Sequence, residues 1–218
     1  FFEDSVTKAE AVFENDEGFY KEYYYDGYLK MEGPIMNGQS EGIWTYYYKE
    51  GGIKAKGLEL EGKKNGHWSY FYKNGSKSSE GTYTNSVKEG EWLYYYQNGK
   101  ISSSGTISKG NREGEWILFH DDGTVKGDVV YVNDIGTYKE FYQNGSIKIE
   151  GELQGAIRKG HWTYYYESGN LEGSCLFVNG VGDYKGFYPN GDLKAEGVLE
   201  GSIKVGLWKL YDKDGKIV

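Results

Sequence analysis

The sequence predicts an all-β protein: an elongated, single-layer, twisted antiparallel β-meander made of tandem β-hairpin repeats. Three observations lead to this fold class. The composition combines 34 Gly, 23 Tyr and 6 Trp with only 2 Pro in 218 residues, which indicates many tight turns between short strands rather than disorder. A glycine-anchored motif recurs along the whole chain, and seven of its nine copies end in Asn-Gly or Asp-Gly. Such pairs between apolar runs are the strongest short-range signal for a β-hairpin.

The repeat has nine copies, each opening on an anchor glycine 24 or 22 residues after the previous one. The anchors are Gly18, Gly42, Gly66, Gly90, Gly114, Gly136, Gly160, Gly182 and Gly206. Two residues after the anchor stands Trp or Tyr, and all 6 Trp occupy this position. Nothing in the composition divides the array. Residues 1–218 are therefore predicted to be a single repeat domain, with a partial repeat over 1–17 and nine repeats, the last truncated, over 18–218.

Within each unit the first expected element is a strand of about six residues, followed by a tight turn and a returning strand. The pair Asn98-Gly99 predicts a two-residue type I′ turn, because both residues tolerate the positive φ that this turn requires. Such a turn fixes the register of the returning strand and places Tyr96 opposite Ile101.

The same register places Trp92 opposite Gly105, and a glycine there leaves room for the indole to lie flat across the neighbouring strand. The last expected element of each unit is a looser loop before the next anchor, and we place the two-residue deletions of the shorter repeats in that loop. In those repeats Val129 and Cys175 replace the glycine. Cys175 is therefore predicted to be a buried core residue beside Trp162, not a reactive thiol.

Alternation along the strands sorts the side chains onto two faces. One face, here called the Trp face, carries the Trp position together with Tyr46 and Tyr48; the opposite face carries Tyr47, flanked by charged residues such as Lys148 and Glu150. A lone hairpin is marginal in water, so the units are expected to pair edge to edge. About 18 strands at about 4.8 Å each would extend on the order of 85 Å.

Charge and motif content argue against several functions. A net charge of −8, with lysines interleaved among glutamates, argues against nucleic acid. No apolar stretch reaches the ~20 residues of a membrane span. His67 and His161 lie four units apart and cannot share a metal, while His120 replaces a tyrosine of the repeat and is predicted to be packed. We find no nucleophile–base pair or phosphate loop, so the sequence predicts a protein without catalytic residues, metal or cofactor.

Six tyrosines of the second to fourth repeats form an aromatic field on the Trp face. They are Tyr46, Tyr48, Tyr70, Tyr72, Tyr94 and Tyr96. Two interpretations stay open: cross-strand aromatic pairs stabilise a sheet, and a large exposed aromatic patch is typical of a contact surface. The position four after the anchor varies between repeats, with Glu140 and Gly186 interrupting the field. The six tyrosines are therefore the predicted partner-binding residues.

The segment GEWLYYYQNG with the following Ile101, and the segment HWTYYYESGNLEG, resemble the MORN (membrane occupation and recognition nexus) repeat in its bacterial variant. That variant reads G-x-W-x-x-Y-Y-x-x-N-G, followed by an aliphatic residue and Glu-Gly. The resemblance covers the chain from about residue 11 to the end. It implies hairpin sheets with a groove that serve as interaction or scaffolding modules, with no defined catalytic set. Bacterial members are often labelled YwqK-family antitoxins, and many others are predicted to be exported or surface proteins.

The prediction is therefore a non-enzymatic, bacterial scaffold that binds another protein. It is expected to be exported to the periplasm or cell surface, with a leader removed before Phe1; a cytoplasmic location stays open. One alternative is a surface glycan or choline-type ligand, because aromatic rings stack on sugars and cage quaternary ammonium. Another is an antitoxin that masks a toxin. The open edges of the sheet would also allow edge-to-edge self-association.

Overall fold

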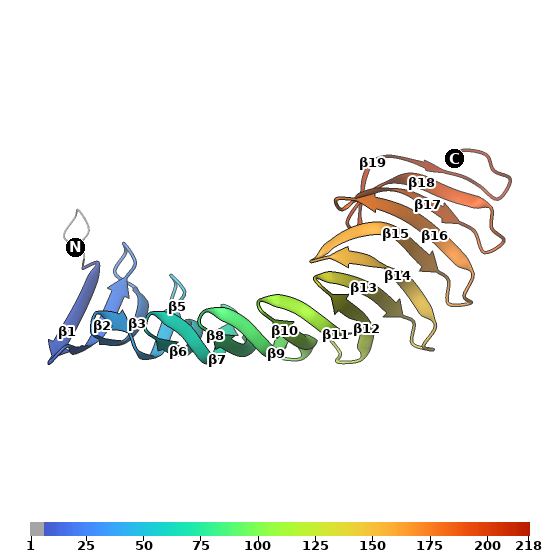
Figure 1. Cartoon of the computed structure of the whole chain (residues 1–218). Coiled ribbons are helices and arrows are strands. Elements are labelled where there is room, and N and C mark those ends of the chain that lie inside the picture. Colours follow the sequence, from blue (N-terminus) through green and yellow to red (C-terminus); the bar gives the residue numbers. More distant parts are fainter. Residues whose placement is uncertain (1–6) are drawn as a thin grey trace. The chain divides into compact units, whose positions relative to one another are not determined.

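A computed structural model describes residues 7–218, and these form 19 β-strands. The chain divides into two compact units, unit 1 (residues 1–111 and 121–123) and unit 2 (residues 112–120 and 124–218). Within each unit the strands follow one another in chain order (Figure 1). Among residues 7–218 we find no helix with the length and apolarity that crossing a membrane requires.

Unit 1 contains β1 (Ala9–Glu14), β2 (Glu17–Tyr23), β3 (Leu29–Met36), β4 (Gln39–Ser40), β5 (Gly42–Tyr47), β6 (Ile53–Leu60), β7 (Lys63–Phe71), β8 (Lys77–Thr84), β9 (Val87–Tyr95) and β10 (Ile101–Ser108). Unit 2 contains, from residue 112 on, β11 (Asn111–Phe119), β12 (Val125–Val132), β13 (Ile135–Phe141), β14 (Ile147–Gln154), β15 (Ile157–Tyr165), β16 (Leu171–Val178), β17 (Val181–Phe187), β18 (Leu193–Glu200) and β19 (Ile203–Leu210).

Neighbouring strands of a unit pair antiparallel, which confirms the predicted all-β meander of tandem hairpins. β4 and β5 are two parts of one strand interrupted at Glu41, and both pair with β3. Because of this interruption, the number of strands is 19, which is one more than two strands for each hairpin would give.

The turn inside each repeat differs from the predicted type I′ turn. In the fourth repeat the Gly99 N–H donates to the carbonyl of Tyr96, and of the residues in this turn only Gly99 has a positive φ, of 85°. The loop is therefore a three-residue turn that closes on a glycine in the left-handed region. Tyr95, not Tyr96, lies opposite Ile101, and a bulge at Ser102 then shifts the register by one residue.

Beyond that bulge the predicted register is confirmed, because Trp92 pairs with Gly105. The indole, however, lies over the glycine on its other side: a Cβ on Gly81, in the preceding repeat, would overlap the Trp92 ring. Trp68 lies in the same way over Gly57, and its indole N–H donates to the carbonyl of the next residue, Leu58, at 2.9 Å. Trp68 and Trp92 therefore tie their own repeats to the ones before them.

The connections between repeats are tighter than the looser loops that the sequence suggests. Asn85 and Ser86 have φ values of 50° and 68°, and they join Thr84 directly to its partner Val87. Positive φ at both central residues is the mark of a type I′ turn. The two-residue turn expected inside the repeat therefore lies between repeats.

The anchor glycine forms a bulge, and this is where the shorter repeats differ. On β7, Trp68 pairs with Gly57 of β6, and Asn65 pairs with the next residue of β6, Leu58. The two residues between them, which include the anchor Gly66 with a φ of 61°, therefore bulge out of the pairing with β6. In the 22-residue spacings β13 and β17 pair with β12 and β16 without any shift. The deletion therefore removes the anchor bulge, which corrects its predicted place in the loop.

The core of each unit consists of the tryptophans and the residues opposite them. Trp68, Trp92 and Trp116 are fully buried. Cys175 is 2% exposed and pairs with Trp162, which confirms its predicted place. The prediction for His120 is wrong, because the structure leaves its side chain exposed at the end of β11.

Candidate functional site

The Trp face of unit 1 carries a continuous series of aromatic rings, here called the aromatic ladder. Its members, in the order of their contacts, are Tyr20, Trp44, Tyr46, Trp68, Tyr70, Trp92 and Tyr94. Successive ring centroids lie 5.9–6.4 Å apart in tilted arrangements, within the range of favourable aromatic pairs. The tyrosine at position four of one repeat thus bridges the tryptophans of two repeats.

Three of the predicted site residues belong to this ladder: Tyr46 and Tyr70 each bridge two tryptophans, and Tyr94 lies against Trp92. All are partly buried, and their hydroxyl groups already have partners within the sheet. The Tyr46 hydroxyl donates to Glu59 at 2.6 Å, and the Tyr70 hydroxyl lies 2.8 Å from that of Tyr83. Burial, strengthened by these partners, raises the pKa of Tyr46 and Tyr70 well above the ordinary tyrosine value. These rings stabilise the sheet as well as forming its surface.

The other three predicted residues, Tyr48, Tyr72 and Tyr96, stand at the start of the turns. The Tyr48 hydroxyl donates to the carbonyl of Phe71, and the Tyr72 hydroxyl to that of Tyr95, both at 2.6 Å. Tyr142 makes the same bond to Tyr165 at 2.7 Å in unit 2. The structure therefore shows two roles among these tyrosines: the rings of Tyr46 and Tyr70 lie between tryptophans, and the hydroxyls of Tyr48 and Tyr72 are tied to the next repeat.

A cation two residues before the anchor lies over the tryptophan of the same repeat, and sequence reasoning missed it. The pairs are Lys64–Trp68, Lys88–Trp92, Arg112–Trp116, Arg158–Trp162 and Lys204–Trp208, at 3.8–4.6 Å from the ring centroid. The recurring signal K/R-x-G-x-W is present in the sequence. The meaning of this signal was missed because the interleaved lysines were assigned to a solvent-exposed face, whereas their aliphatic stems cover the indole rings.

The opposite face carries tyrosine–glutamate pairs. The Tyr165 hydroxyl donates to Glu150 at 2.7 Å, as predicted for that face, and the Tyr47 hydroxyl donates to Glu32 at 2.6 Å. Where position five is Phe71 instead, the residue fifteen earlier is Lys56. Tyr165 and Tyr47 therefore each have a carboxylate acceptor on this face.

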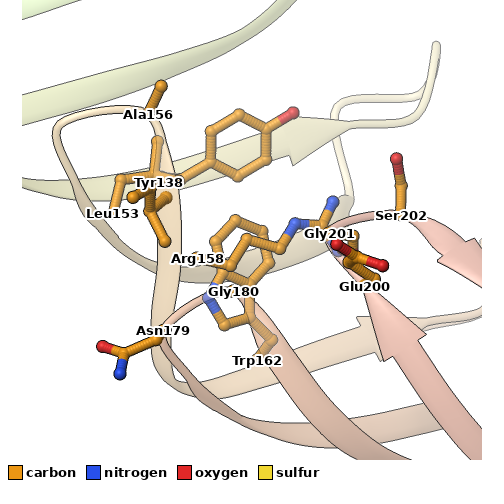
Figure 2. Close-up of a pocket in the computed structure, with 11 residues that line it drawn as sticks. Tyr138, Leu153, Ala156, Arg158, Trp162, Asn179, Gly180, Glu200, Gly201 and Ser202 are labelled. Carbon is orange, nitrogen blue, oxygen red and sulfur yellow. Dashed lines mark hydrogen bonds between the residues drawn. The ribbon is translucent and has the colours of Figure 1, made fainter.

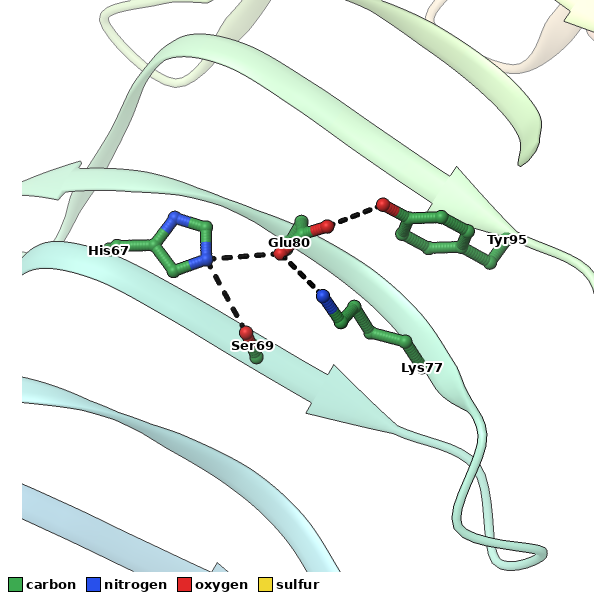
Figure 3. A network of polar contacts seen from close by, with 5 residues as sticks. All are labelled: His67, Ser69, Lys77, Glu80 and Tyr95. Atoms are coloured by element: carbon green, nitrogen blue, oxygen red, sulfur yellow. Dashed lines mark hydrogen bonds and ion pairs between the residues drawn. The ribbon is translucent and has the colours of Figure 1, made fainter. Parts of the chain in front are cut away.

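Figure 3 shows the densest polar network of this face, in which Glu80 accepts hydrogen bonds from Tyr95, Lys77 and His67. The His67 Nε2 atom lies 3.1 Å from Glu80 and 3.4 Å from the Ser69 hydroxyl. A nucleophile–base relay needs its serine and its carboxylate on different nitrogens of the imidazole. Here both contact the same nitrogen of an exposed ring, so this arrangement is a surface ion-pair network.

In unit 2 the position four after the anchor is more varied, and the face is less completely filled. Glu140 takes the place of a bridging tyrosine and is 7% exposed. Burial opposes its ionisation, but hydrogen bonds from Lys148 and Tyr138 outweigh that effect and lower its pKa. Lys148 lies 3.0 Å from Glu140, so the bulge near the turn directs Lys148 to the Trp face, which corrects its predicted place on the opposite face.

Several hollows open on unit 2, and Arg158 lines the two that are described next. The first has a volume of about 490 Å³ and lies between Tyr138, Trp162 and the turn at Gly201. Figure 2 shows Arg158 extended over the Trp162 ring toward Glu200 and Ser202. The second, of about 430 Å³, lies between Tyr164 and Trp208. Both could accept a side chain or small ligand from solution.

Among residues 7–218 no group of three or more His, Cys, Asp or Glu side chains is placed to hold a metal ion. Comparison with known protein families matches six segments of the chain to the MORN repeat variant. The segments are residues 64–85, 88–108, 112–133, 135–154, 158–179 and 181–199. A search of curated proteins with this sequence finds no match.

Proposed function

Because the chain belongs to the MORN repeat variant family, whose repeats are generally associated with binding or scaffold roles, we propose that it is a non-enzymatic scaffold for protein–protein interaction. The partner surface is the tyrosine-bearing face of unit 1, made by Tyr46, Tyr48, Tyr70, Tyr72, Tyr94 and Tyr96. From the resemblance noted in the sequence we further propose a bacterial, exported protein.

The observation that carries the proposal is the aromatic ladder. It holds Tyr46 and Tyr70 between tryptophans and Tyr94 against Trp92, so their rings are fixed before any partner arrives. Tyrosine and tryptophan are enriched in protein interfaces, and a rigid aromatic surface loses little conformational entropy on binding. A row of preorganised, partly exposed rings suits a protein partner that spans several repeats.

A choline-type ligand is less well supported. Recognition of quaternary ammonium needs an aromatic ring whose face is free for the cation. In five of the six tryptophan repeats the chain's own Lys or Arg already lies over the indole. This occupancy favours a protein partner over a small cation.

The test exchanges Tyr46, Tyr70 and Tyr94 together for Leu. Leucine stands at this position naturally in Leu118 and Leu210, so the repeat accepts it, whereas Ser would leave gaps between tryptophans. A partner captured by the wild-type protein should bind the triple variant at least about tenfold more weakly in a direct titration, because central aromatic contacts dominate interfaces.

The matched control is Tyr165→Leu, the same exchange on the opposite face of unit 2 and away from its hollows, which should leave partner binding unchanged. Far-UV circular dichroism checks that both variants are folded. Unchanged binding by a folded triple variant would remove the tyrosine field as the partner surface, and glycan binding without protein binding would favour the carbohydrate alternative.

A further inference from the structure

The second hollow of unit 2 lies where one repeat lacks the bridging tyrosine. Gly186 occupies position four after the anchor in this repeat, the position held by Tyr46, Tyr70 and Tyr94 in unit 1. The rings of Tyr184 and Trp208 line the space, with centroids 5.7 Å apart. The hollow of about 430 Å³ therefore has aromatic walls and a glycine in place of the side chain that fills other repeats.

The side chains around this hollow are mainly cationic. Lys148, Arg158, Lys194 and Lys204 line it, against the single carboxylate of Glu172, which leaves a formal charge of +3 on the lining of a chain whose net charge is −8. Lys148 is paired with Glu140 at 3.0 Å, outside this lining set. The other three cations form no ion pair with a carboxylate among residues 7–218.

These cations are held in position by neutral groups. The Arg158 guanidinium donates to the Tyr164 hydroxyl at 2.7 Å and to the carbonyl of Gly201 at 3.2 Å. Lys204 lies 4.5 Å from the centroid of the Trp208 ring. No hydrogen bond joins the Tyr184 hydroxyl to a described residue, so this hydroxyl adds an available donor to the wall. Arg158 and Lys204 are thus held in place, and the lining keeps a net positive charge.

We propose that this hollow binds an acidic side chain of a protein partner. The carboxylate lies among Arg158, Lys194 and Lys204, and the aliphatic stem packs against Tyr184 and Trp208. Charge-assisted hydrogen bonds to a carboxylate are strong where both groups are partly desolvated. An amino-acid side chain suits the space because a tyrosine occupies the equivalent place in other repeats. The site lies in unit 2 and does not rest on the partner surface proposed on unit 1.

The test uses a blocked peptide, acetyl-Gly-Glu-Gly-Glu-Gly-amide, titrated into the whole protein by calorimetry or NMR. We expect saturable binding that weakens with added salt, since exposed charges are screened, and no binding of the same peptide with Gln in place of Glu. The double variant Lys194→Gln/Lys204→Gln should bind about tenfold more weakly. The control Lys213→Gln/Lys216→Gln removes the same charge from an exposed turn and should bind as the wild type does.

A second variant, Gly186→Tyr, restores the ring of the other repeats and should abolish peptide binding. A Cβ there would lie 2.9 Å from the Tyr184 ring, which must move slightly; if this variant does not fold, the lysine pair still decides. The proposal is overturned if the Glu and Gln peptides bind alike, if the lysine pair has no effect, or if inorganic phosphate or phosphatidylserine vesicles bind in a Lys194- and Lys204-dependent way while the Glu peptide does not.

Discussion

Units 1 and 2 share the packing of tryptophan against glycine, and one difference between them lies at position four of the repeat. In both, a tryptophan lies over a glycine of the preceding strand and beneath a cation two residues before the anchor, as Trp92 does in unit 1 and Trp162 in unit 2. At position four, unit 1 places Tyr46, Tyr70 and Tyr94, whereas unit 2 includes Gly186. This shared packing therefore holds the sheet together, and position four decides whether its Trp face is filled or hollow.

The largest expected effect comes from removing a tryptophan, and it tests whether both units are held together by the same packing of tryptophan over glycine. Trp92→Ala and Trp162→Ala each remove a buried indole and its contact with the preceding repeat. Each should lower the free energy of unfolding by about 3–5 kcal/mol, the usual range for a large aromatic in a core. Urea unfolding followed by circular dichroism measures the loss. A negligible loss of unfolding free energy in one unit only would show that the two units do not share this tryptophan packing.

A smaller effect is expected from the glycine beneath the indole. Gly81→Ala forces a methyl group into the buried Trp92 ring, and overpacking of this kind costs about 1–3 kcal/mol. Gly151→Ala, beneath Trp162, should cost a similar amount in unit 2. Thermal unfolding measures both. If Gly81→Ala is neutral, the tryptophan does not lie over the preceding repeat.

The cations over the indoles should separate the two units. Lys88→Gln removes a cation–π contact with Trp92, worth about 0.5–1 kcal/mol. Arg158→Gln should cost more, about 1–2 kcal/mol, because Arg158 also holds Tyr164 and Gly201. The exposed Lys109→Gln is the control. Equal losses at Lys88 and Arg158 would mean that Arg158 does not link the repeats of unit 2.

The smallest effect concerns Cys175, which marks a tightly packed place in the otherwise more open unit 2. Burial raises the pKa of its thiol to about 11, from an ordinary value of 9.0. The folded state therefore favours the neutral thiol, and its contribution to stability is present below pH 9 and is lost as the pH rises toward 11. Thiol reagents should label the native protein slowly near pH 8 and the urea-unfolded protein rapidly. Rapid native labelling would contradict the packing opposite Trp162.

The fold and the Trp–Gly register followed from the sequence because both depend on spacing alone. The turn type did not, since the bulge at Ser102 offsets the extra turn residue and leaves Trp92 opposite Gly105 as a two-residue turn would. The place of the deletions was also ambiguous, because removing two residues from a loop or from the bulge at Gly66 keeps the same alternation.

The candidate sites were predictable to different degrees. The six tyrosines could be found from the repeat, but their hydroxyl partners, such as Glu59 for Tyr46, could not, because they come from the far end of the returning strand. The hollow beside Gly186 was visible only as an interruption of the tyrosine field. Its charge comes from Arg158 on β15 and Lys204 on β19, and only the curvature of the sheet within unit 2 brings these two together.

The central claim is that position four fills or opens the Trp face, and fluorine NMR of fluorotryptophan-labelled protein tests it most directly. Single Trp→Phe variants assign the six resonances, and the solvent isotope shift reports the exposure of each indole. Trp208, which lines the hollow, should show a clear shift, whereas the fully buried Trp68 and Trp92 should show none. Gly186→Tyr should reduce the Trp208 shift. Equal shifts for Trp92 and Trp208, or a Trp208 shift unchanged by Gly186→Tyr, would contradict the account.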